Sequence, residues 1–372
     1  MTPLKWFSGF LKKYRLVIVI GLVLMTVIVA CAIVNPYISG MIVDDVIQGG
    51  AYDLLPKLIG IMLAVTAVRA ILRYATQMMF ETCSQGVLYR MRDAVYRKLL
   101  QEDFAFYNRN RTGDLMSRQT GDMDAIRHFV AFVIYTVYEN ILMFIFALVM
   151  IFMVNVKLAL CMMAVLPFCL FTTYLQSKHV KPRFHECRQS FSSLNAFVQE
   201  NISGNRVVKA FAKEEYEKEK FEKENDKYRE AELGAASIWC RFVPIFELLS
   251  NLLMVVLILY GGYQVICGEM TLGNLVTVNG YLWMLSNPLR FAGWWVNDVQ
   301  RFITSVEKIY DTYSKEPDVK KPKKGIKRKE MQGNIEFRNV SYEVEGEDII
   351  HNISFSVEKG QTVGILGSTG AG

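Results

Sequence analysis

Residues 16–43, LVIVIGLVLMTVIVACAIVNPYISGMIV, contain no charged residue. An α-helix of about 20 apolar residues crosses the hydrocarbon core of a bilayer, so this stretch is long enough to span a membrane. The composition agrees with this interpretation, because 52% of the 372 residues are hydrophobic and the mean hydropathy is +0.21. We therefore predict that residues 16–43 form the first span of a polytopic membrane protein.

Residues 1–15 place Trp6, Phe7 and Phe10 at helical spacing among basic residues. This pattern is typical of a short helix that lies in the cytoplasmic interface of the membrane. The alternative is an aromatic and basic flank of the first span. The apolar run that follows is too long for the h-region of a signal peptide, so we expect the first span to remain in the protein.

Further apolar stretches predict five more spans, at residues 54–79, 129–154, 158–175, 242–267 and 272–295. Short polar turns at residues 155–157 and 268–269 separate two pairs of these spans. We therefore predict an all-α membrane domain of six long transmembrane helices within residues 16–313.

Two long charged segments, at about residues 80–128 and 176–241, connect these spans and keep a helix-compatible sequence. Ten Lys or Arg residues occur from residue 69 to 127 and thirteen from 178 to 241. Basic residues accumulate in cytoplasmic loops, so we expect both segments and both chain termini to be cytoplasmic, in a plasma membrane. Helices rise about 1.5 Å per residue, so twenty extra residues would extend about 30 Å beyond the bilayer.

The C-terminal part has a different pattern. A basic, proline-containing linker, residues 314–333, precedes residues 334–372, in which 334–340 and 351–357 alternate as strands. Residues 361–366 predict a buried strand that leads into a Gly-x-x-x-x-Gly phosphate-binding loop, formed by Gly367, Ser368, Thr369, Gly370, Ala371 and Gly372. Two spaced glycines are a weak signal alone, but the order of strand and loop predicts the first strands of an α/β P-loop nucleotide-binding domain.

Glu139 lies in the third predicted span. A carboxylate inside the bilayer costs several kcal/mol unless it faces a cavity or a partner, so Glu139 is a candidate for substrate contact. The alternative is a hydrogen bond to a neighbouring span. Further candidates for the same cavity in the sixth span are Asn279, Asn287, Arg290, Trp294 and Trp295. Trp294 and Trp295 also fit an interfacial aromatic belt.

The seven cysteines and four histidines show no disulfide or metal-ligand spacing, so we predict no metal site and no catalytic residue. The net charge of +6 is accounted for by basic cytoplasmic loops. A nucleic-acid partner is therefore not expected.

Three stretches resemble the half-transporters of the ATP-binding cassette (ABC) superfamily, in particular the type I exporter fold of bacterial multidrug and lipid exporters. FYN at residues 106–108 with TGDLMSR at 112–118 is similar to the first intracellular loop of that family. QENISGNRVVKAF at residues 199–211 is similar to the second loop. Residues 334–372 resemble the first strands of the cassette, so the resemblance extends over the whole chain.

The resemblance implies half of an ATP-driven exporter that moves amphipathic or hydrophobic substrates, drug-like or lipid, across the bilayer by alternating access. It implies a dimer with a second half-transporter, identical or different, and ATP with Mg²⁺ in the complete protein. The coupling helices that it implies comprise Phe104, Ala105, Phe106, Tyr107 and Asn108, and then Gln199, Glu200, Asn201, Ile202, Ser203 and Gly204. Nucleotide contacts are implied for Tyr342, Val344 and residues 367–372.

The sequence departs from the family pattern at Val344, where an adenine-stacking aromatic residue is usual. Either Tyr342 or another aromatic residue stacks on the adenine instead, or nucleotide stacking is weak, which would agree with one half of a heterodimeric exporter. The sequence ends at Gly372, before the loop lysine and the catalytic glutamate, so we do not expect these residues alone to hydrolyse ATP. The alternatives are a membrane pairing or regulatory module without transport activity, import by the same fold and, least consistent with the spans, an ion channel.

Overall fold

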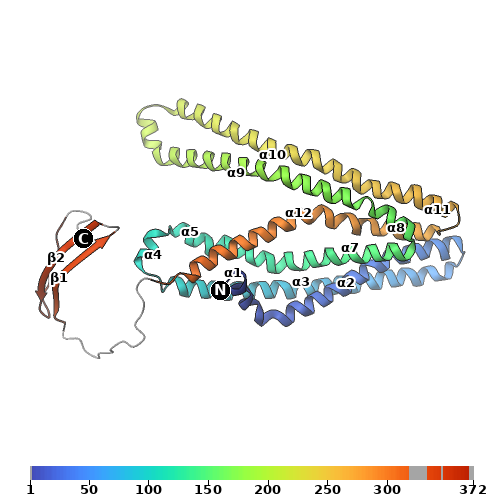
Figure 1. The fold of residues 1–372 in the computed structure, drawn as a ribbon, viewed down its shortest axis with the longest axis horizontal. Helices are drawn as coiled ribbons and strands as arrows, with labels where there is room; N and C mark the ends of the chain where they lie inside the picture. Colours follow the sequence, from blue (N-terminus) through green and yellow to red (C-terminus); the bar gives the residue numbers. More distant parts are fainter. Residues whose placement is uncertain (1, 318–332, 345–346, 368–372) are drawn as a thin grey trace. The chain divides into compact units, whose positions relative to one another are not determined.

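The structure is a computed structural model that describes residues 2–317, 333–344 and 347–367 (Figure 1). The chain divides into two compact units, Met1–Pro317 and Asp318–Gly372. The side chains of Arg290 and Val344 lie outside the described part.

The described residues of the first unit form helices. The long helices are α2 (Arg15–Met41), α3 (Leu55–Leu99), α7 (Ile134–Val154), α9 (Leu166–Ala210), α10 (Glu214–Val256) and α12 (Leu272–Ser314). The short helices are α1 (Pro3–Leu11), α4 (Phe104–Arg109), α5 (Thr112–Ser117), α6 (Met123–His128), α8 (Val156–Met163) and α11 (Gly262–Ile266). Turns of π-helix lie at Ile42–Gln48, Arg118–Asp122, Phe129–Val133 and Leu257–Gly261, and 3₁₀ turns at Lys12–Tyr14 and Tyr52–Leu54.

Five continuous helical segments of the described chain are long and apolar enough to cross a membrane, namely Pro3–Gln48, Tyr52–Leu99, Thr112–Val154, Val156–Ala210 and Glu214–Ile266. They contain the first five predicted spans. The sixth predicted span forms part of α12, which is less apolar because it carries Asn274, Asn279 and Asn287. This helix packs against α2 and α7, and Asn274 and Asn287 are partly buried there, whereas Asn279 is exposed.

The main apolar core of the described residues combines side chains of α12 with those of α2, α7, α8, α9 and α10. Tyr281 of α12 is fully buried among side chains of α2, α7 and α10. Its hydroxyl donates a hydrogen bond of 3.0 Å to the Ile33 carbonyl oxygen, which satisfies the polar end of the ring in an apolar environment. The core therefore holds the helices that border the cavities described below.

Helix α1 contacts protein with its aromatic face. Trp6 and Phe7 are only 7% and 4% exposed. The ring of Phe7 lies 5.0 Å from that of Phe302, and the ring of Trp6 lies 5.0 Å from that of Tyr313, both on α12. The large apolar area of these rings is thus buried against α12 and not against lipid. The interfacial location of residues 1–15 remains a prediction.

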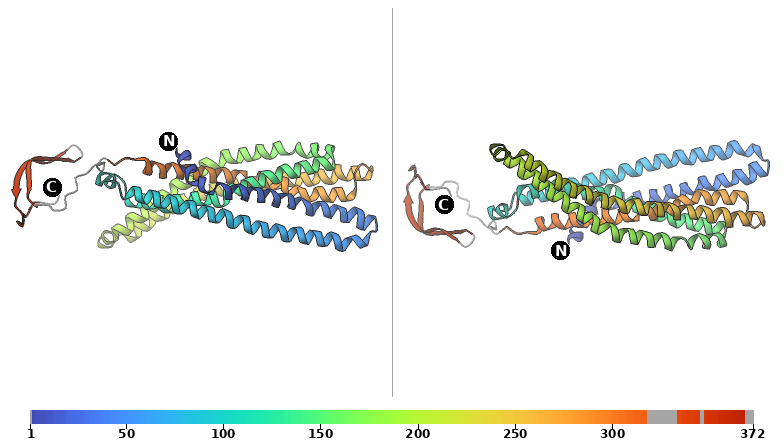
Figure 2. Two further views of the ribbon diagram at one scale, coloured as in Figure 1. Left: turned by 90° about the horizontal axis from the view of Figure 1, so that it is seen from below. Right: turned by 90° about the horizontal axis from the view of Figure 1, so that it is seen from above.

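Helices α9 and α10 form an antiparallel hairpin that runs side by side over most of its length (Figure 1). Figure 2 shows the hairpin crossing the remaining helices at an angle. The chain reverses after α9 at residues 211–213, where Ala212 has a φ of 50°. The second long charged segment, predicted at about residues 176–241, therefore comprises the parts of the two paired helices on either side of this turn.

The second unit contains an antiparallel pair of strands, β1 (Ile335–Val344) and β2 (Glu347–Val357). Phe337 pairs with Phe355 in the register, and their rings stack at 4.6 Å. Both predicted strands are confirmed, and both are longer than expected.

The buried strand predicted at residues 361–366 is wrong. These residues have no regular structure, and Ile365 and Leu366 are 87% and 98% exposed. A central strand needs partner strands and apolar cover, and the described part of this unit provides only a two-stranded hairpin. The predicted loop residues Ser368, Thr369, Gly370, Ala371 and Gly372, and residues 318–332 of the predicted linker, lie outside the described residues.

Candidate functional site

A cavity of about 360 Å³ lies between α3, α7 and α12, and we call it the Glu139 cavity. It is lined by Arg69, Arg73 and Gln77 of α3, by Phe132, Tyr135, Thr136, Glu139, Asn140 and Met143 in and just before α7, and by Trp283, Asn287, Phe291, Trp294, Trp295 and Asp298 of α12. The structure thus brings together four of the predicted cavity residues, namely Glu139, Asn287, Trp294 and Trp295. Asn279 is not part of the lining.

Glu139 forms an ion pair across the cavity wall with Arg73 of α3. The Arg73 Nη2 atom donates to both carboxylate oxygens, at 2.8 and 2.7 Å. The side chain of Glu139 is 6% exposed and that of Arg73 is 37% exposed. A charge removed from water needs such a partner, and the pair leaves this part of the cavity wall electrically neutral. The hydrogen bond to a neighbouring span is therefore present, and Glu139 also lines a cavity, whereas its contact with a substrate stays a prediction.

Aromatic rings of α12 also line the Glu139 cavity. Trp283 and Trp294 are exposed, and the ring of Phe291 lies edge-on to Trp294 at 5.8 Å. Trp294 also meets Trp239 of α10 in a T-shaped arrangement at 6.4 Å. Trp294 therefore contacts a neighbouring helix and lines a cavity, in addition to any role in an aromatic belt.

A second cavity of about 310 Å³ lies between α9, α10 and α12 and shares Phe291 and Trp294 with the first. We call it the Glu247 cavity, after the charged residue in its lining. Glu247 was not predicted from the sequence. It could have been, because it is a carboxylate in the fifth predicted span, and the cost of a charge inside the bilayer applies to it as it does to Glu139.

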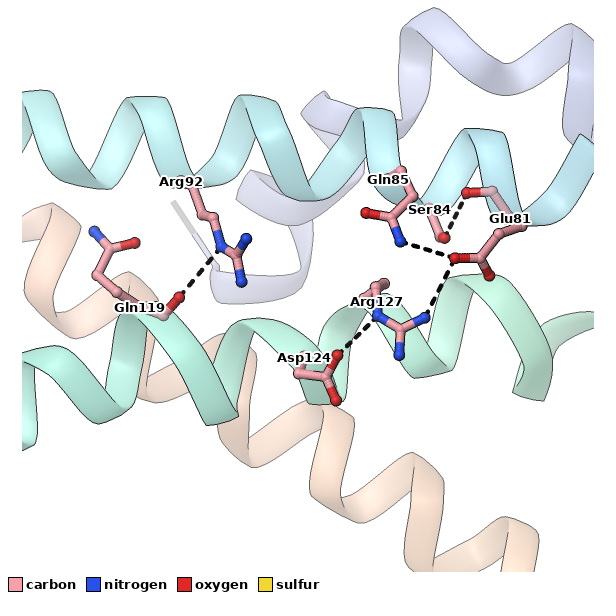
Figure 3. A network of polar contacts seen from close by, with 7 residues as sticks. All are labelled: Glu81, Ser84, Gln85, Arg92, Gln119, Asp124 and Arg127. Carbon is pink, nitrogen blue, oxygen red and sulfur yellow. Dashed lines mark hydrogen bonds and ion pairs between the residues drawn. The ribbon is translucent and has the colours of Figure 1, made fainter.

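A polar network joins α3 to α6 (Figure 3). Arg127 donates to Asp124 at 2.7 Å and to Glu81 at 3.4 Å, and Gln85 donates to Glu81 at 2.8 Å. Arg92 donates to the backbone oxygen of Gln119 at 3.3 Å (Figure 3). These contacts attach the chain that follows α5 to the helix that carries Arg73.

Further contacts attach the same stretch to α12. Asp122 accepts a hydrogen bond of 2.9 Å from the Ser305 hydroxyl and lies 3.7 Å from Lys308 Nζ. Arg118 donates to the Thr312 hydroxyl. Residues 118–127 are therefore bonded to both α3 and α12, and both of these helices line the Glu139 cavity.

The first set of predicted coupling residues, Phe104, Ala105, Phe106, Tyr107 and Asn108, forms most of α4. Asp103 caps this helix by accepting a hydrogen bond of 2.9 Å from the Phe106 N–H. Phe106 is buried, whereas Phe104 is 88% exposed. The ring of Phe106 thus packs α4 against the rest of the domain, and the ring of Phe104 is open to solvent.

The second predicted set does not form a separate short helix. Gln199, Glu200, Asn201, Ile202, Ser203 and Gly204 lie inside α9, and the chain turns only after Ala210. Their backbone continues the helix that forms the hairpin with α10, because extending an existing helix costs less than starting a new one. Ile202 is exposed near this end of the hairpin.

The residues predicted to contact nucleotide are in the second unit. Tyr342 is exposed on β1, and Gly367 is the last described residue. The other predicted loop residues, 368–372, lie outside the described residues, so the nucleotide contacts stay a prediction.

The family model described as the ABC transporter transmembrane region matches residues 18–289. The chain belongs to this family, and it is a multi-pass membrane protein. The resemblance and the fold class predicted from the sequence are thereby confirmed.

Relatives of the chain include three bacterial proteins. The uncharacterized ABC transporter ATP-binding protein YknU of Bacillus subtilis (strain 168) is 32% identical, over 100% of this chain and 64% of that protein. The probable multidrug resistance ABC transporter ATP-binding/permease protein YheI of the same organism is 33% identical, over 100% and 64%. The ATP-dependent lipid A-core flippase of Syntrophus aciditrophicus (strain SB) is 25% identical, over 88% and 55%. The chain thus spans less than two thirds of the length of these relatives.

Proposed function

We propose that the chain supplies the membrane domain for half of an ATP-driven exporter of amphipathic or hydrophobic substrates. The observation that carries this proposal is the Glu139 cavity, which lies among predicted membrane spans and combines a neutral ion pair with exposed aromatic rings. Aromatic rings offer a large apolar contact area, and the few polar groups can orient a bound molecule. The printed names of relatives, which include a multidrug resistance protein and a lipid A-core flippase, support the same class.

In the proposed mechanism, two such halves, identical or different, enclose a pathway in the plasma membrane, with both chain termini cytoplasmic. ATP with Mg²⁺ in the complete protein supplies the free energy through its greater affinity for one of two conformations. Within this chain, α4 and the part of α9 next to the turn at residues 211–213 receive the movement of the nucleotide-binding domains. Their coupling residues and the nucleotide contacts of Tyr342, Val344 and residues 367–372 belong to the proposal.

The attachments of α4 and α5 give the proposal a physical route. The polar contacts from residues 118–127 to α3 and α12 join the cytoplasmic helices to two walls of the Glu139 cavity. Helices transmit a rotation along their length because their backbone hydrogen bonds are internal. A shift of α4 would then change the distance between these walls and so the access to the Glu139 cavity.

The proposal is tested with the complete gene product in inverted membrane vesicles. We expect ATP-dependent accumulation of an uncharged amphipathic dye, with none in vesicles that receive a non-hydrolysable ATP analogue. If no amphipathic probe accumulates although the protein is folded and inserted, the exporter proposal fails, and the chain is interpreted as a membrane pairing or regulatory module.

The coupling role of α4 predicts a specific effect of Phe104→Ala. Phe104 is 88% exposed, so its truncation removes little packing within this chain. We expect ATP-dependent uptake of the dye to fall several-fold while the thermal unfolding midpoint stays unchanged. Uptake and unfolding of the same purified preparation are the two measurements.

Phe106→Ala is the matched control on the same helix. Phe106 is buried, so its truncation should lower the stability of the domain by about 3 kcal/mol. Normal uptake in Phe104→Ala would contradict a coupling contact at this ring.

A further inference from the structure

The Glu247 cavity has an aromatic wall contributed by two helices. Trp239 comes from α10 and Trp294 from α12, and their rings meet edge-to-face at 6.4 Å. The rings of Phe246 of α10 and Phe291 of α12 also line the cavity. The faces of such rings carry partial negative charge, and they attract cations that come within about 6 Å of the ring centre.

Glu247 is the only charged side chain among the described residues that line this cavity, and its side chain is exposed. Within the described part of the chain it forms no ion pair. Glu139 in the neighbouring cavity differs, because Arg73 already neutralises it. A carboxylate in a membrane span is stabilised when a positive charge joins it, so the Glu247 cavity is electrostatically complementary to a cation.

We propose that the Glu247 cavity binds a lipophilic organic cation, with Glu247 as its counter-charge and Trp239 and Trp294 as aromatic contacts. The volume of about 310 Å³ is at the lower end of the range for small-molecule sites, and it suits a compact cationic group with an apolar remainder. This assignment rests on the proposed exporter function and specifies a substrate class for it.

A phospholipid headgroup with a quaternary ammonium would also carry positive charge. It would bring a phosphate next to that charge, however, and the described lining of the Glu247 cavity contains no basic side chain to receive it. A free monocation therefore fits the lining better than a zwitterionic lipid.

The test compares two ligands of nearly equal shape and opposite charge, tetraphenylphosphonium and tetraphenylborate. Binding of each to the purified complete protein in lipid nanodiscs is measured by equilibrium dialysis, with Trp fluorescence as a second readout. We expect the cation to bind at least tenfold more tightly than the anion. Glu247→Gln should weaken cation binding at least tenfold, and Glu247→Asp should retain the preference for the cation.

Glu222→Gln is the matched control, because it removes the same charge from an exposed position on the same helix, outside the lining of the Glu247 cavity. It should leave cation binding unchanged. Equal affinity for both ligands, or cation binding that survives Glu247→Gln, would overturn the assignment. Displacement of the cation by phosphatidylcholine in the nanodisc would instead identify a lipid headgroup as the occupant and would also overturn it.

The same preparations separate this inference from the exporter proposal. ATP-dependent uptake of the uncharged dye without cation binding would refute the Glu247 site and leave the exporter standing. Cation binding that depends on Glu247, without ATP-dependent movement of any probe, would refute the exporter and leave a binding site.

Discussion

Replacing Arg73 by Met is expected to destabilise the membrane domain by about 3 kcal/mol. The substitution leaves the Glu139 carboxylate, which is 6% exposed, without the guanidinium that now bonds to both of its oxygens. Removing one member of a largely buried ion pair strands an uncompensated charge, and that cost exceeds the lost attraction itself. Denaturant-titrated unfolding of the complete protein in mixed micelles measures the change in the free energy of unfolding.

The double variant Arg73→Met with Glu139→Met should recover most of this loss, because removing both charges leaves no stranded carboxylate. Arg97→Met is the matched control. Arg97 pairs with Asp93 at 2.9 Å, but their side chains are 73% and 47% exposed, so its loss should cost less than about 1 kcal/mol. Additive losses in the double variant would show that the Arg73–Glu139 pair is not a coupled unit.

Gly273→Val is expected to cost about 3 kcal/mol or more, because two backbones meet at this position. The Gly40 carbonyl oxygen at the end of α2 and the Asp44 carboxylate lie where a Cβ atom would stand. Asp44 also accepts a hydrogen bond of 2.6 Å from the Gly273 N–H, which fixes the start of α12 against the chain that follows α2. A side chain at residue 273 must push these elements apart, and a backbone cannot move aside as a flexible side chain can.

Expression in the membrane and denaturant-titrated unfolding are the measurements for Gly273→Val. The matched control is Gly60→Ala in α3, where a Cβ would meet nothing within 4 Å. This substitution should be neutral or slightly stabilising, since Ala has the higher helix propensity. A Gly273→Val protein as stable as the unchanged protein would mean that α2 and α12 do not approach closely at this point.

The helical membrane fold was largely predictable from the sequence. Hydropathy and charge are properties of consecutive residues, and a span of apolar residues must form its hydrogen bonds internally whatever its neighbours are. This is why the first five spans, the turn before α8 and the two long charged excursions agree with the observed helices. The sixth predicted span is helical as part of α12, but its asparagines make it less apolar than the others, and it is not among the five segments that are apolar enough to cross a membrane.

Contacts between distant residues were not predictable in the same way. Nothing near Glu139 in the sequence identifies Arg73 as its partner, since the two side chains meet only when α3 packs beside α7. The burial of Trp6 and Phe7 against α12 likewise depends on where the chain returns some 300 residues later. The carboxylate of Glu247 could have been identified from its predicted span. That it lines a cavity was not predictable, because the Glu247 cavity needs α9, α10 and α12 together.

The strand predicted at residues 361–366 is a case in which a local sequence pattern led to a wrong prediction. Its apolar sequence is suited to a central strand, but a strand forms only when neighbouring strands pair with its backbone. The sequence by itself thus determined which segments are helical and apolar enough to cross a membrane, because the bilayer acts on each apolar segment separately. Tertiary structure decided which charges pair, which rings face a cavity and which strand forms, because these outcomes depend on partners from distant parts of the chain.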